Sequence, residues 1–249
     1  MKLNTIYNED CLLGMSRIPD RSIDLILCDL PYGITVCKWD IVVPFEPLWS
    51  QYNRIAKENA AIVLFSCEPF TSALITSNQK SFRYHWIWNK GRGNNFAHAQ
   101  RMPMKSHEEI CVFYKKQPIY NPQWWYSKPY KALNSVRNRP SEMLGSGRIN
   151  EYNFKNGSED GRRYPLSILN FSRDTNGLHP TQKPVALLEY LIKTYTNDGE
   201  VVLDNCFGSG STLVAAINTN RNYIGFELES KYYNIASERL DAATTQKAS

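Results

Sequence analysis

Four consecutive residues, Asp29-Leu30-Pro31-Tyr32, combine groups that could do chemistry on a flat nitrogen base. The apolar segment before them, Ile23–Cys28, is typical of a buried parallel strand, and sites of open α/β sheets lie just beyond the carboxyl ends of such strands. Asp29 could accept a hydrogen bond from an amino group, Pro31 fixes the chain, and Tyr32 offers a ring for stacking. An Asx-turn or a helix cap would also explain Asp29, and Pro31 and Tyr32 could be turn residues alone.

The chemistry that this carboxylate could support is attack by an exocyclic amine of adenine or cytosine. Such an amine is conjugated with its ring and is a weak nucleophile, and a carboxylate with an ordinary pKa of about 4 cannot deprotonate it outright. The carboxylate can accept a hydrogen bond from the amine and can take or relay its proton as positive charge develops. Extrusion of the base from a duplex costs a few kcal/mol, and stacking on Tyr32 returns about 1–3 kcal/mol. We therefore take Asp29, Pro31 and Tyr32 as the candidate catalytic residues.

A second candidate segment lies late in the chain, where VVLDNCFGSGSTLVAAI reads as a strand, a tight turn and a helix in series. Gly208 and Gly210 allow a sharp bend and close approach of a ligand to free N–H groups at the helix start. A dinucleotide fingerprint would need glycine in place of Leu213, and a Walker loop would need a lysine that this turn lacks. Glu227 closes the next strand, where an acid reaches ribose hydroxyls in such folds. The turn suits a nucleoside; an ordinary βα turn followed by a surface glutamate is the alternative.

Regular elements that could position these two segments are predicted on both sides of an irregular stretch. Strands are expected at 22–28, 61–66, 83–89, 109–114, 200–203 and 223–227, and helices at about 45–56, 184–195, 211–218 and 231–240. Strands that alternate with helices indicate an α/β fold, a mostly parallel twisted sheet with helices on both faces. Residues 115–177, rich in proline, glycine and asparagine with interleaved aromatic rings, predict a loop-rich insertion. We expect three parts: 1–115, 116–178 and 179–249.

Bulk composition narrows the class of protein. No apolar segment approaches the roughly 20 residues of a membrane span, and the N-terminus is polar where a signal peptide is apolar. The six cysteines form no CxxC pair and are typical of core residues in a reducing cytosol, and the four histidines lack metal-site spacing. We therefore expect a cytoplasmic protein with neither a membrane nor a metal as partner. The net charge of +5 permits an anionic partner such as nucleic acid without requiring one.

Several motifs in one order carry a family resemblance. Asp29-Leu30-Pro31-Tyr32 early and Phe207-Gly208-Ser209-Gly210 late resemble the circularly permuted beta class of S-adenosylmethionine-dependent DNA amino-methyltransferases. His179-Pro180-Thr181-Gln182-Lys183-Pro184 is similar to the segment that precedes the cofactor turn in that class, and Asp10-Cys11 to its adenine-contacting acidic segment. Trp86–Lys90 and His107-Glu108 match framework and site segments less specifically. The resemblance covers about three quarters of the chain, without the insertion, and implies a Rossmann-like methyltransferase fold.

The resemblance also implies a role for each matched residue. Asp29 and Pro31 would hold the target amine, and Tyr32 would stack on the flipped base. Glu227 would bind the ribose hydroxyls of S-adenosylmethionine, which becomes S-adenosylhomocysteine. Asp10 would contact the cofactor's adenine, and residues 181–183 its methionine end. The full set of candidate cofactor residues is Asp10, Cys11, Asp29, Thr181, Gln182, Lys183, Asp204, Asn205, Phe207, Gly208, Ser209, Gly210, Ser211, Thr212, Glu227 and Leu228.

In the resembled class the target-recognition region lies where this chain has its insertion. Basic residues mixed with Trp and Tyr suit contacts to phosphates and bases, so we assign this region to recognition of double-stranded DNA. The candidate DNA-binding residues are Lys90, Arg92, Arg137, Arg139, Arg148, Arg162 and Arg163. We expect a monomer or a homodimer, associated with the nucleoid when bound to DNA.

Two departures from the family pattern concern positions whose side chains the chemistry does not need. Leu30 replaces a commoner proline, and Asn205-Cys206 replaces a common pair that contains proline. Adenine is the expected base because Asp opens the turn, whereas cytosine-amino enzymes more often resemble Ser-Pro-Pro-Tyr; chemistry alone leaves cytosine open. A nicotinamide oxidoreductase, a methyltransferase acting on protein glutamine and a non-catalytic nucleic-acid-binding protein are more remote alternatives. The biological setting, whether restriction–modification, phage or solitary, stays open.

Overall fold

The computed structural model describes residues 1–35, 37, 40–94, 96–130, 158–174 and 182–248. The chain divides into two compact units, one formed by Met1–Asn121 with Leu166–Ser249 and the other by Pro122–Pro165. The first unit carries the sheet and both predicted site segments, so it is described first. No helix among the described residues is long and apolar enough to cross a membrane.

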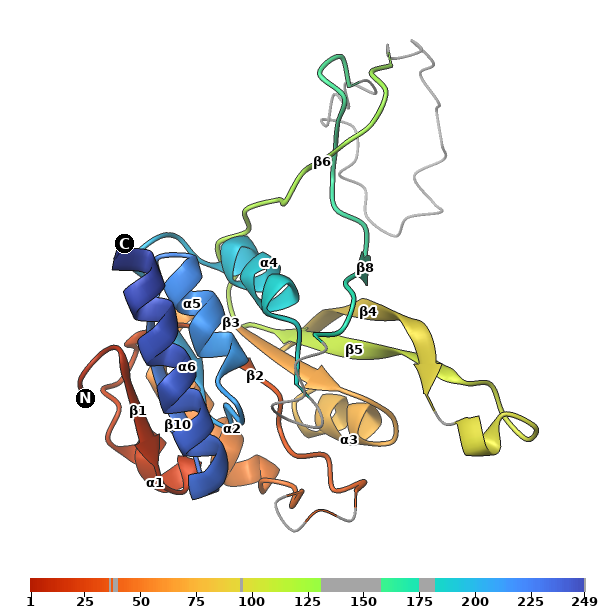
Figure 1. Ribbon diagram of the computed structural model, residues 1–249. Helices are drawn as coiled ribbons and strands as arrows, with labels where there is room; N and C mark the ends of the chain where they lie inside the picture. The colour runs from red at the N-terminus through yellow and green to blue at the C-terminus, as the bar shows by residue number, and fades with distance from the viewer. Residues whose placement is uncertain (36, 38–39, 95, 131–157, 175–181, 249) are drawn as a thin grey trace. The chain divides into compact units, whose positions relative to one another are not determined.

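An eight-stranded sheet organises the first unit (Figure 1). Five neighbouring strands, from β1 at one edge of the sheet to β3 near its centre, are joined by four parallel pairings. The carboxyl ends of these five strands therefore lie along the same edge. β5 runs antiparallel to both of its neighbours, and the last strand, β8, is parallel to β4. The spatial order is β1 (Thr5–Asn8), β10 (Asn222–Glu227), β9 (Val201–Asp204), β2 (Ile23–Cys28), β3 (Ala56–Ser66), β5 (Lys105–Phe113), β4 (Phe82–Asn94) and β8 (Ile168–Asn170).

Helices cover both faces of this sheet, and the alternation of side chains along β2 shows why. Leu25 and Leu27 point into one apolar cluster, with α4, α5 and α6, whereas Ile26 and Cys28 point into the other, with α1, α2 and α3. Both faces are therefore buried, at a gain of roughly 1.5–3 kcal/mol for each large apolar side chain. The helices are α1 (Cys11–Ser16), α2 (Phe45–Ile55), α3 (Phe70–Ser77), α4 (Val185–Tyr195), α5 (Ser211–Asn218) and α6 (Ser230–Ala248).

The fold confirms the predicted α/β class and every strand and helix that periodicity indicated. Their ends differ in places: β3 begins at Ala56, five residues earlier than expected, and α6 extends to Ala248. The short elements β1, α1, α3 and β8 were not predicted, because three to eight residues give too few repeats for a clear period. β8 lies inside the predicted insertion 116–178 and pairs with β4, so that insertion is loop-rich only in part.

The second unit is built on a two-stranded antiparallel pairing of β6 (Trp125–Tyr126) with β7 (Arg162–Arg163). Two of its described basic side chains lie on aromatic rings: the Arg162 guanidinium is 5.5 Å from the Trp124 ring centre, and that of Arg163 is 4.6 Å from the ring centre of Tyr130. Such cation–π contacts hold both guanidinium groups at the surface of the unit. The other candidate arginines of the insertion, Arg137, Arg139 and Arg148, lie outside the described residues.

Candidate active site

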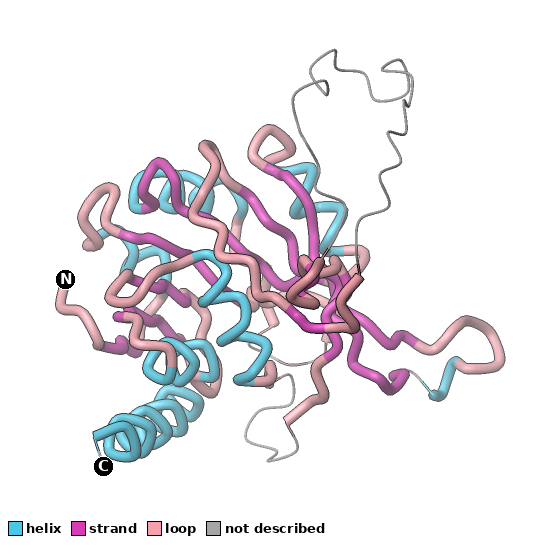
Figure 2. Tube along the Cα trace, turned by 90° about the horizontal axis from the view of Figure 1, so that it is seen from above, coloured by secondary structure: helices cyan, strands magenta, loops and turns pink. Residues whose placement is uncertain are grey.

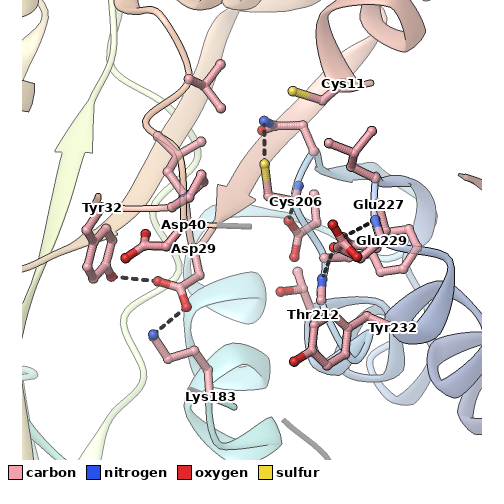
Figure 3. A pocket seen from close by; sticks show the side chains of 18 of the residues that line it. Cys11, Asp29, Tyr32, Asp40, Lys183, Cys206, Thr212, Glu227, Glu229 and Tyr232 are labelled. Carbon is pink, nitrogen blue, oxygen red and sulfur yellow. Dashed lines mark hydrogen bonds and ion pairs between the residues drawn. The ribbon is translucent and has the colours of Figure 1, made fainter. Parts of the chain in front are cut away.

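A cavity of about 660 Å³ opens at the carboxyl edge of the parallel strands. The segments that follow β2, β9 and β10 supply much of its wall, which is where open α/β sheets place their ligands. The volume lies within the range of roughly 300–1,000 Å³ that is usual for small-molecule sites. Figure 3 shows two groups of polar side chains across this cavity, one around Asp29 and one around Glu227. We call them the Asp29 end and the Glu227 end.

At the Asp29 end, the carboxylate that follows β2 is held by two donors (Figure 3). The Tyr32 hydroxyl donates to Oδ1 at 2.6 Å, and the Lys183 ammonium donates to Oδ2 at 2.5 Å. The Tyr32 ring stacks on Phe70, with ring centres 5.0 Å apart, so one face of the ring is already occupied. The contacts with Tyr32 and Lys183 fix the orientation of the Asp29 carboxylate, and all three residues line the cavity.

Lys183 belongs to a longer row of alternating charges. Its ammonium lies 3.3 Å from Oε2 of Glu108, whose Oε1 accepts from the ammonium of Lys90. The side chains of Lys183, Lys90 and Glu108 are only 6%, 7% and 14% exposed. Buried ions need partners of opposite sign, so the order Asp29, Lys183, Glu108, Lys90 is self-compensating. These residues come from the β2 turn, the start of α4, β5 and β4.

The protonation states follow from this arrangement. Burial raises the pKa of Asp29 above its ordinary value, and Lys183 opposes that rise. Burial alone would lower the pKa of Lys183, but Asp29 and Glu108 together raise it. Burial acts to raise the pKa of Glu108, yet the two lysines lower it overall. The site therefore favours a charged lysine between two ionised carboxylates, with Asp29 the one more easily protonated.

The loop after Tyr32 is tied to the same end of the cavity by Asp40. Its carboxylate accepts from the backbone N–H groups of Gly33, Ile34 and Thr35, at 2.8, 2.9 and 2.7 Å. Burial works against the charge, but these hydrogen bonds lower the pKa of Asp40 overall. The loop thus keeps its shape through an ionised side chain that the sequence analysis had not selected.

At the Glu227 end, the turn after β9 depends on glycine. Gly210 has φ +81°, and a Cβ there would lie 2.9 Å from Cβ of Ala236 on α6, so neither the backbone nor the packing admits a side chain. Arg239 of α6 donates to the carbonyl oxygen of Ser209 at 2.5 Å and fixes the turn from outside. Asp204 accepts from the Cys206 N–H at 3.1 Å, and burial raises the pKa of Asp204 to about 7.

Glu227 links the two turns of this end. Its carboxylate accepts from the N–H of Gly208 at 2.8 Å and from the N–H of Glu229 at 2.9 Å. Burial raises the pKa of Glu227, and both hydrogen bonds oppose that rise. Asp10, which ends the loop after β1, accepts from the N–H groups of Leu12 and Leu13 and caps α1. Both carboxylates retain acceptor capacity toward the cavity that they line.

The hydrogen-bond acceptors at the Glu227 end fit S-adenosylmethionine. Carboxylates suit the ribose hydroxyls and the ammonium group at the methionine end of that molecule, both of which are hydrogen-bond donors. Exposed Leu228 offers an apolar surface to a base, and Oε1 of Gln182 is buried with no hydrogen-bond partner among the described residues. An unpartnered acceptor in a pocket wall suits a ligand amino group.

The cavity brings together most of the residues selected from the sequence. Its wall includes Asp10, Cys11, Asp29, Pro31, Tyr32, Lys90, Gln182, Lys183, Asp204, Asn205, Phe207, Gly208, Ser209, Ser211, Thr212, Glu227 and Leu228. Gly210 shapes the turn behind the wall, and Thr181 lies outside the described residues. All six cysteines are free thiols, and no group of ligating side chains in the described part of the chain is arranged to hold a metal ion.

Two placements differ from what the sequence led us to expect. Lys90 was selected for a contact to DNA, but its ammonium is buried against Glu108, away from an open surface. Lys183 was assigned to the cofactor's methionine end, but it donates to Asp29. Glu108, which joins them, was matched only as part of the less specific segment His107-Glu108 and was not among the candidate site residues. The sign that could have assigned it to the site is the pair of glutamates, Glu108-Glu109, directly before the apolar segment 110–113 of β5.

Comparisons with known proteins agree with this geometry. A family model described as DNA methylase, and named for N6 and N4 enzymes, matches residues 23–238, so the chain belongs to that family. It is 25% identical to the type II methyltransferase M.HindIII of Haemophilus influenzae, over 96% of this chain and 95% of that protein. It is 26% identical to the DNA adenine methyltransferase YhdJ of Escherichia coli, over 98% of this chain and 85% of that protein.

A solved structure shares the fold. The M1.HpyAVI–SAM complex superposes with a TM-score of 0.62 at 23% identity, covering 94% of this chain and 98% of that one. The family match identifies the chain as a DNA methyltransferase of the N6 and N4 type, and its fold and cavity fit S-adenosylmethionine as the methyl donor.

Proposed function

We propose that the target is the N6 amino group of adenine in double-stranded DNA, flipped out of the helix into the Asp29 end of the cavity. The observation that carries this proposal is the Asp29 carboxylate, which directly follows β2, lines the cavity and accepts a hydrogen bond from Tyr32. Asp as the opening residue of the turn and the similarity to an adenine methyltransferase both favour adenine. The N4 amino group of cytosine is the second candidate, because the family includes enzymes of both kinds.

In the proposed reaction the cofactor, when bound, supplies an electrophilic methyl group. The Asp29 carboxylate accepts a hydrogen bond from the amine and orients its lone pair toward that methyl group. Each carboxylate oxygen has two acceptor sites, so Asp29 can receive the amine while it keeps Tyr32 and Lys183. As the bond from the amine nitrogen to the methyl carbon forms in place of the methyl–sulfur bond of the donor, the nitrogen would become positive and its proton would pass to Asp29, with S-adenosylhomocysteine as the leaving thioether.

The row of buried charges determines how well Asp29 performs this task. Lys183 favours the ionised acceptor form of the carboxylate, and Glu108 with Lys90 holds Lys183 in place. Lys183 and Glu108 are thus positioning residues in this proposal, and Lys90 belongs to the pocket wall instead of the DNA surface. Glu227, Asp10, Gln182 and the turn 204–209 bind the cofactor.

For DNA contacts we propose Arg92 in the first unit and Arg162 and Arg163 in the second, with Arg137, Arg139 and Arg148 as further candidates. Arg162 and Arg163 are already held at a surface by aromatic rings that could also contact bases. We expect a cytoplasmic enzyme that works as a monomer or a homodimer on chromosomal or invading DNA.

Mapping of modified bases tests this proposal. Genomic DNA from cells that express the protein should contain N6-methyladenine in one short sequence context, and DNA from cells that express the Asp29→Ala variant should not. Digestion to nucleosides and mass spectrometry report the base, and modification-sensitive sequencing reports the context. N4-methylcytosine would select the second candidate, and unmodified DNA from active, folded protein would overturn both.

A further inference from the structure

The hairpin between β4 and β5 carries an unusual set of side chains at the mouth of the cavity. From Gly91 to Lys105 the sequence GRGNNFAHAQRMPMK contains three basic residues, Arg92, Arg101 and Lys105, and no acidic one. The whole chain has a net charge of +5, so this short hairpin is much more basic than the rest of the protein. Such a segment is suited to a polyanion.

The hairpin begins and ends beside the cavity, and its tip lies away from it. Lys90, Asn94 and Lys105, at its root, line the cavity. Beyond the pair Asn94 and Lys105, the chain leaves the sheet and extends past the helices in both views (Figures 1 and 2). We call residues 91–94 and 96–104 the arm. A ligand that occupies the cavity beside Lys90, Asn94 and Lys105 therefore lies next to the base of the arm.

The tip of the arm presents apolar side chains to solvent. Phe96 is 83% exposed, and Met102 is 52% exposed. The tip nevertheless has a defined backbone, with a short 3-10 turn at Phe96–His98 and hydrogen bonds from the N–H of Ala99 to the Phe96 carbonyl and from the N–H of Arg101 to the His98 carbonyl. An ordered tip that exposes an aromatic ring between basic residues indicates a binding surface.

We propose that the arm is a base-flipping wedge: its basic residues contact the phosphates of duplex DNA, and Phe96 enters the base stack at the place that the target base vacates. This inference rests on the proposed function, because it requires duplex DNA as the substrate. Extrusion of a base leaves a gap between its neighbours, and an apolar side chain inserted there replaces part of the lost stacking. Arg92 and Arg101 flank Phe96 in the sequence and supply the charges that bring the tip to the duplex.

The test compares Phe96→Ala with wild type on two duplexes of the same sequence. In one the target base is paired, and in the other it faces an abasic site, so that it is already unpaired. We expect kcat/KM of the variant to fall about tenfold to hundredfold on the paired duplex, the range that loss of one stacking ring produces. On the unpaired duplex it should lie within about threefold of wild type, with an unchanged cofactor Kd, because the wedge is no longer needed.

A matched control and a second readout accompany this test. Leu13→Ala also truncates an exposed apolar side chain, 66% exposed, on α1 at the opposite side of Figure 1, and should leave both rates unchanged. Fluorescence of 2-aminopurine at the target position reports flipping directly, and its rise on binding should be lost in Phe96→Ala. Arg92→Gln and Arg101→Gln should each reduce the slope of log affinity against log salt by about one.

Several results would overturn the inference. They are an unchanged rate of Phe96→Ala on the paired duplex, an equal loss on both duplexes, or a change of oligomeric state, which would make the tip a contact between copies of the chain. Failure of the proposed function has a different signature, since wild-type protein would then methylate neither duplex.

Discussion

At the Asp29 end of the cavity, charged side chains from four separate parts of the chain hold one another, whereas at the Glu227 end carboxylates are held by backbone N–H groups of nearby turns. Asp29, Lys183, Glu108 and Lys90 compensate each other's charge. Glu227 depends on the N–H groups of residues 208 and 229. The first arrangement tunes a protonation state, and the second presents a rigid set of acceptors to a ligand. In the proposed mechanism, this difference separates the chemistry of the reaction, at the Asp29 end, from the binding of the cofactor, at the Glu227 end.

Replacement of Lys183 by Met should have the largest effect among the residues around Asp29, because it leaves two buried carboxylates without their shared cation. Lys183 lowers the pKa of Asp29, so its loss raises that pKa, and the ionised acceptor forms at higher pH. We expect kcat near neutral pH to fall by about two orders of magnitude, and the acidic limb of the pH–rate profile to move upward.

Steady-state rates across pH, together with the cofactor Kd, check this result. A Kd within about threefold of wild type supports the role at Asp29. A large rise in Kd with an unmoved pH profile would contradict it and would return Lys183 to the methionine end of the cofactor.

These two ends also differ in how far they could be predicted. The Glu227 end is local in sequence: a strand, glycines at 208 and 210, a helix and the acid that closes the next strand were all selected in advance. The Asp29 end was recognised at 29–32, but Glu108 was matched only within a less specific segment, and its ion pairs with Lys183 and Lys90 were not predicted. Ion pairs between residues more than 70 positions apart depend on how β2, β5 and α4 are stacked in space, which periodicity does not report.

Glu227→Gln should weaken cofactor binding at the Glu227 end of the cavity. The carboxylate now accepts from two backbone N–H groups, and in the variant the amide nitrogen of Gln, itself a donor, would face one of them. The ribose hydroxyls would also lose an ionised acceptor. We expect the cofactor Kd to rise about tenfold or more, while kcat at saturating cofactor stays within a few-fold of wild type. Isothermal titration and cofactor-saturation kinetics measure the two quantities. A fall in kcat that saturation does not restore would count against the separation of binding from chemistry.

Glu108→Gln should have a smaller effect, opposite in direction to that of Lys183→Met. Glu108 is a negative neighbour that raises the pKa of Asp29, so its removal lowers that pKa. The acidic limb of the pH–rate profile should therefore move downward, with kcat reduced by about tenfold because Lys183 is less firmly held. Shifts of the two variants in the same direction would contradict the proposed row of charges.

The smallest expected effect concerns stability of the protein without cofactor. Burial raises the pKa of Asp204 to about 7, above the value of about 3.9 for an unfolded chain. Its contribution to the free energy of unfolding is therefore full below about pH 4 and is lost as pH rises through about 7. Asp204→Asn should show a weaker decline in urea stability between about pH 4 and about pH 7 than wild type. The exposed Asp20→Asn change is the control, and an identical decline in all three proteins would refute the expectation.

Replacement of Asp29 by Ala, with cofactor binding and methyl transfer measured on the same preparation, tests the central claim most directly. The claim is that Asp29 serves the reaction and that the Glu227 end binds the cofactor on its own. Transfer of labelled methyl groups to duplex DNA should fall by about three orders of magnitude or more, while the Kd for S-adenosylmethionine stays within about threefold of wild type. Retained methyl transfer, or a parallel loss of cofactor binding, would contradict the account.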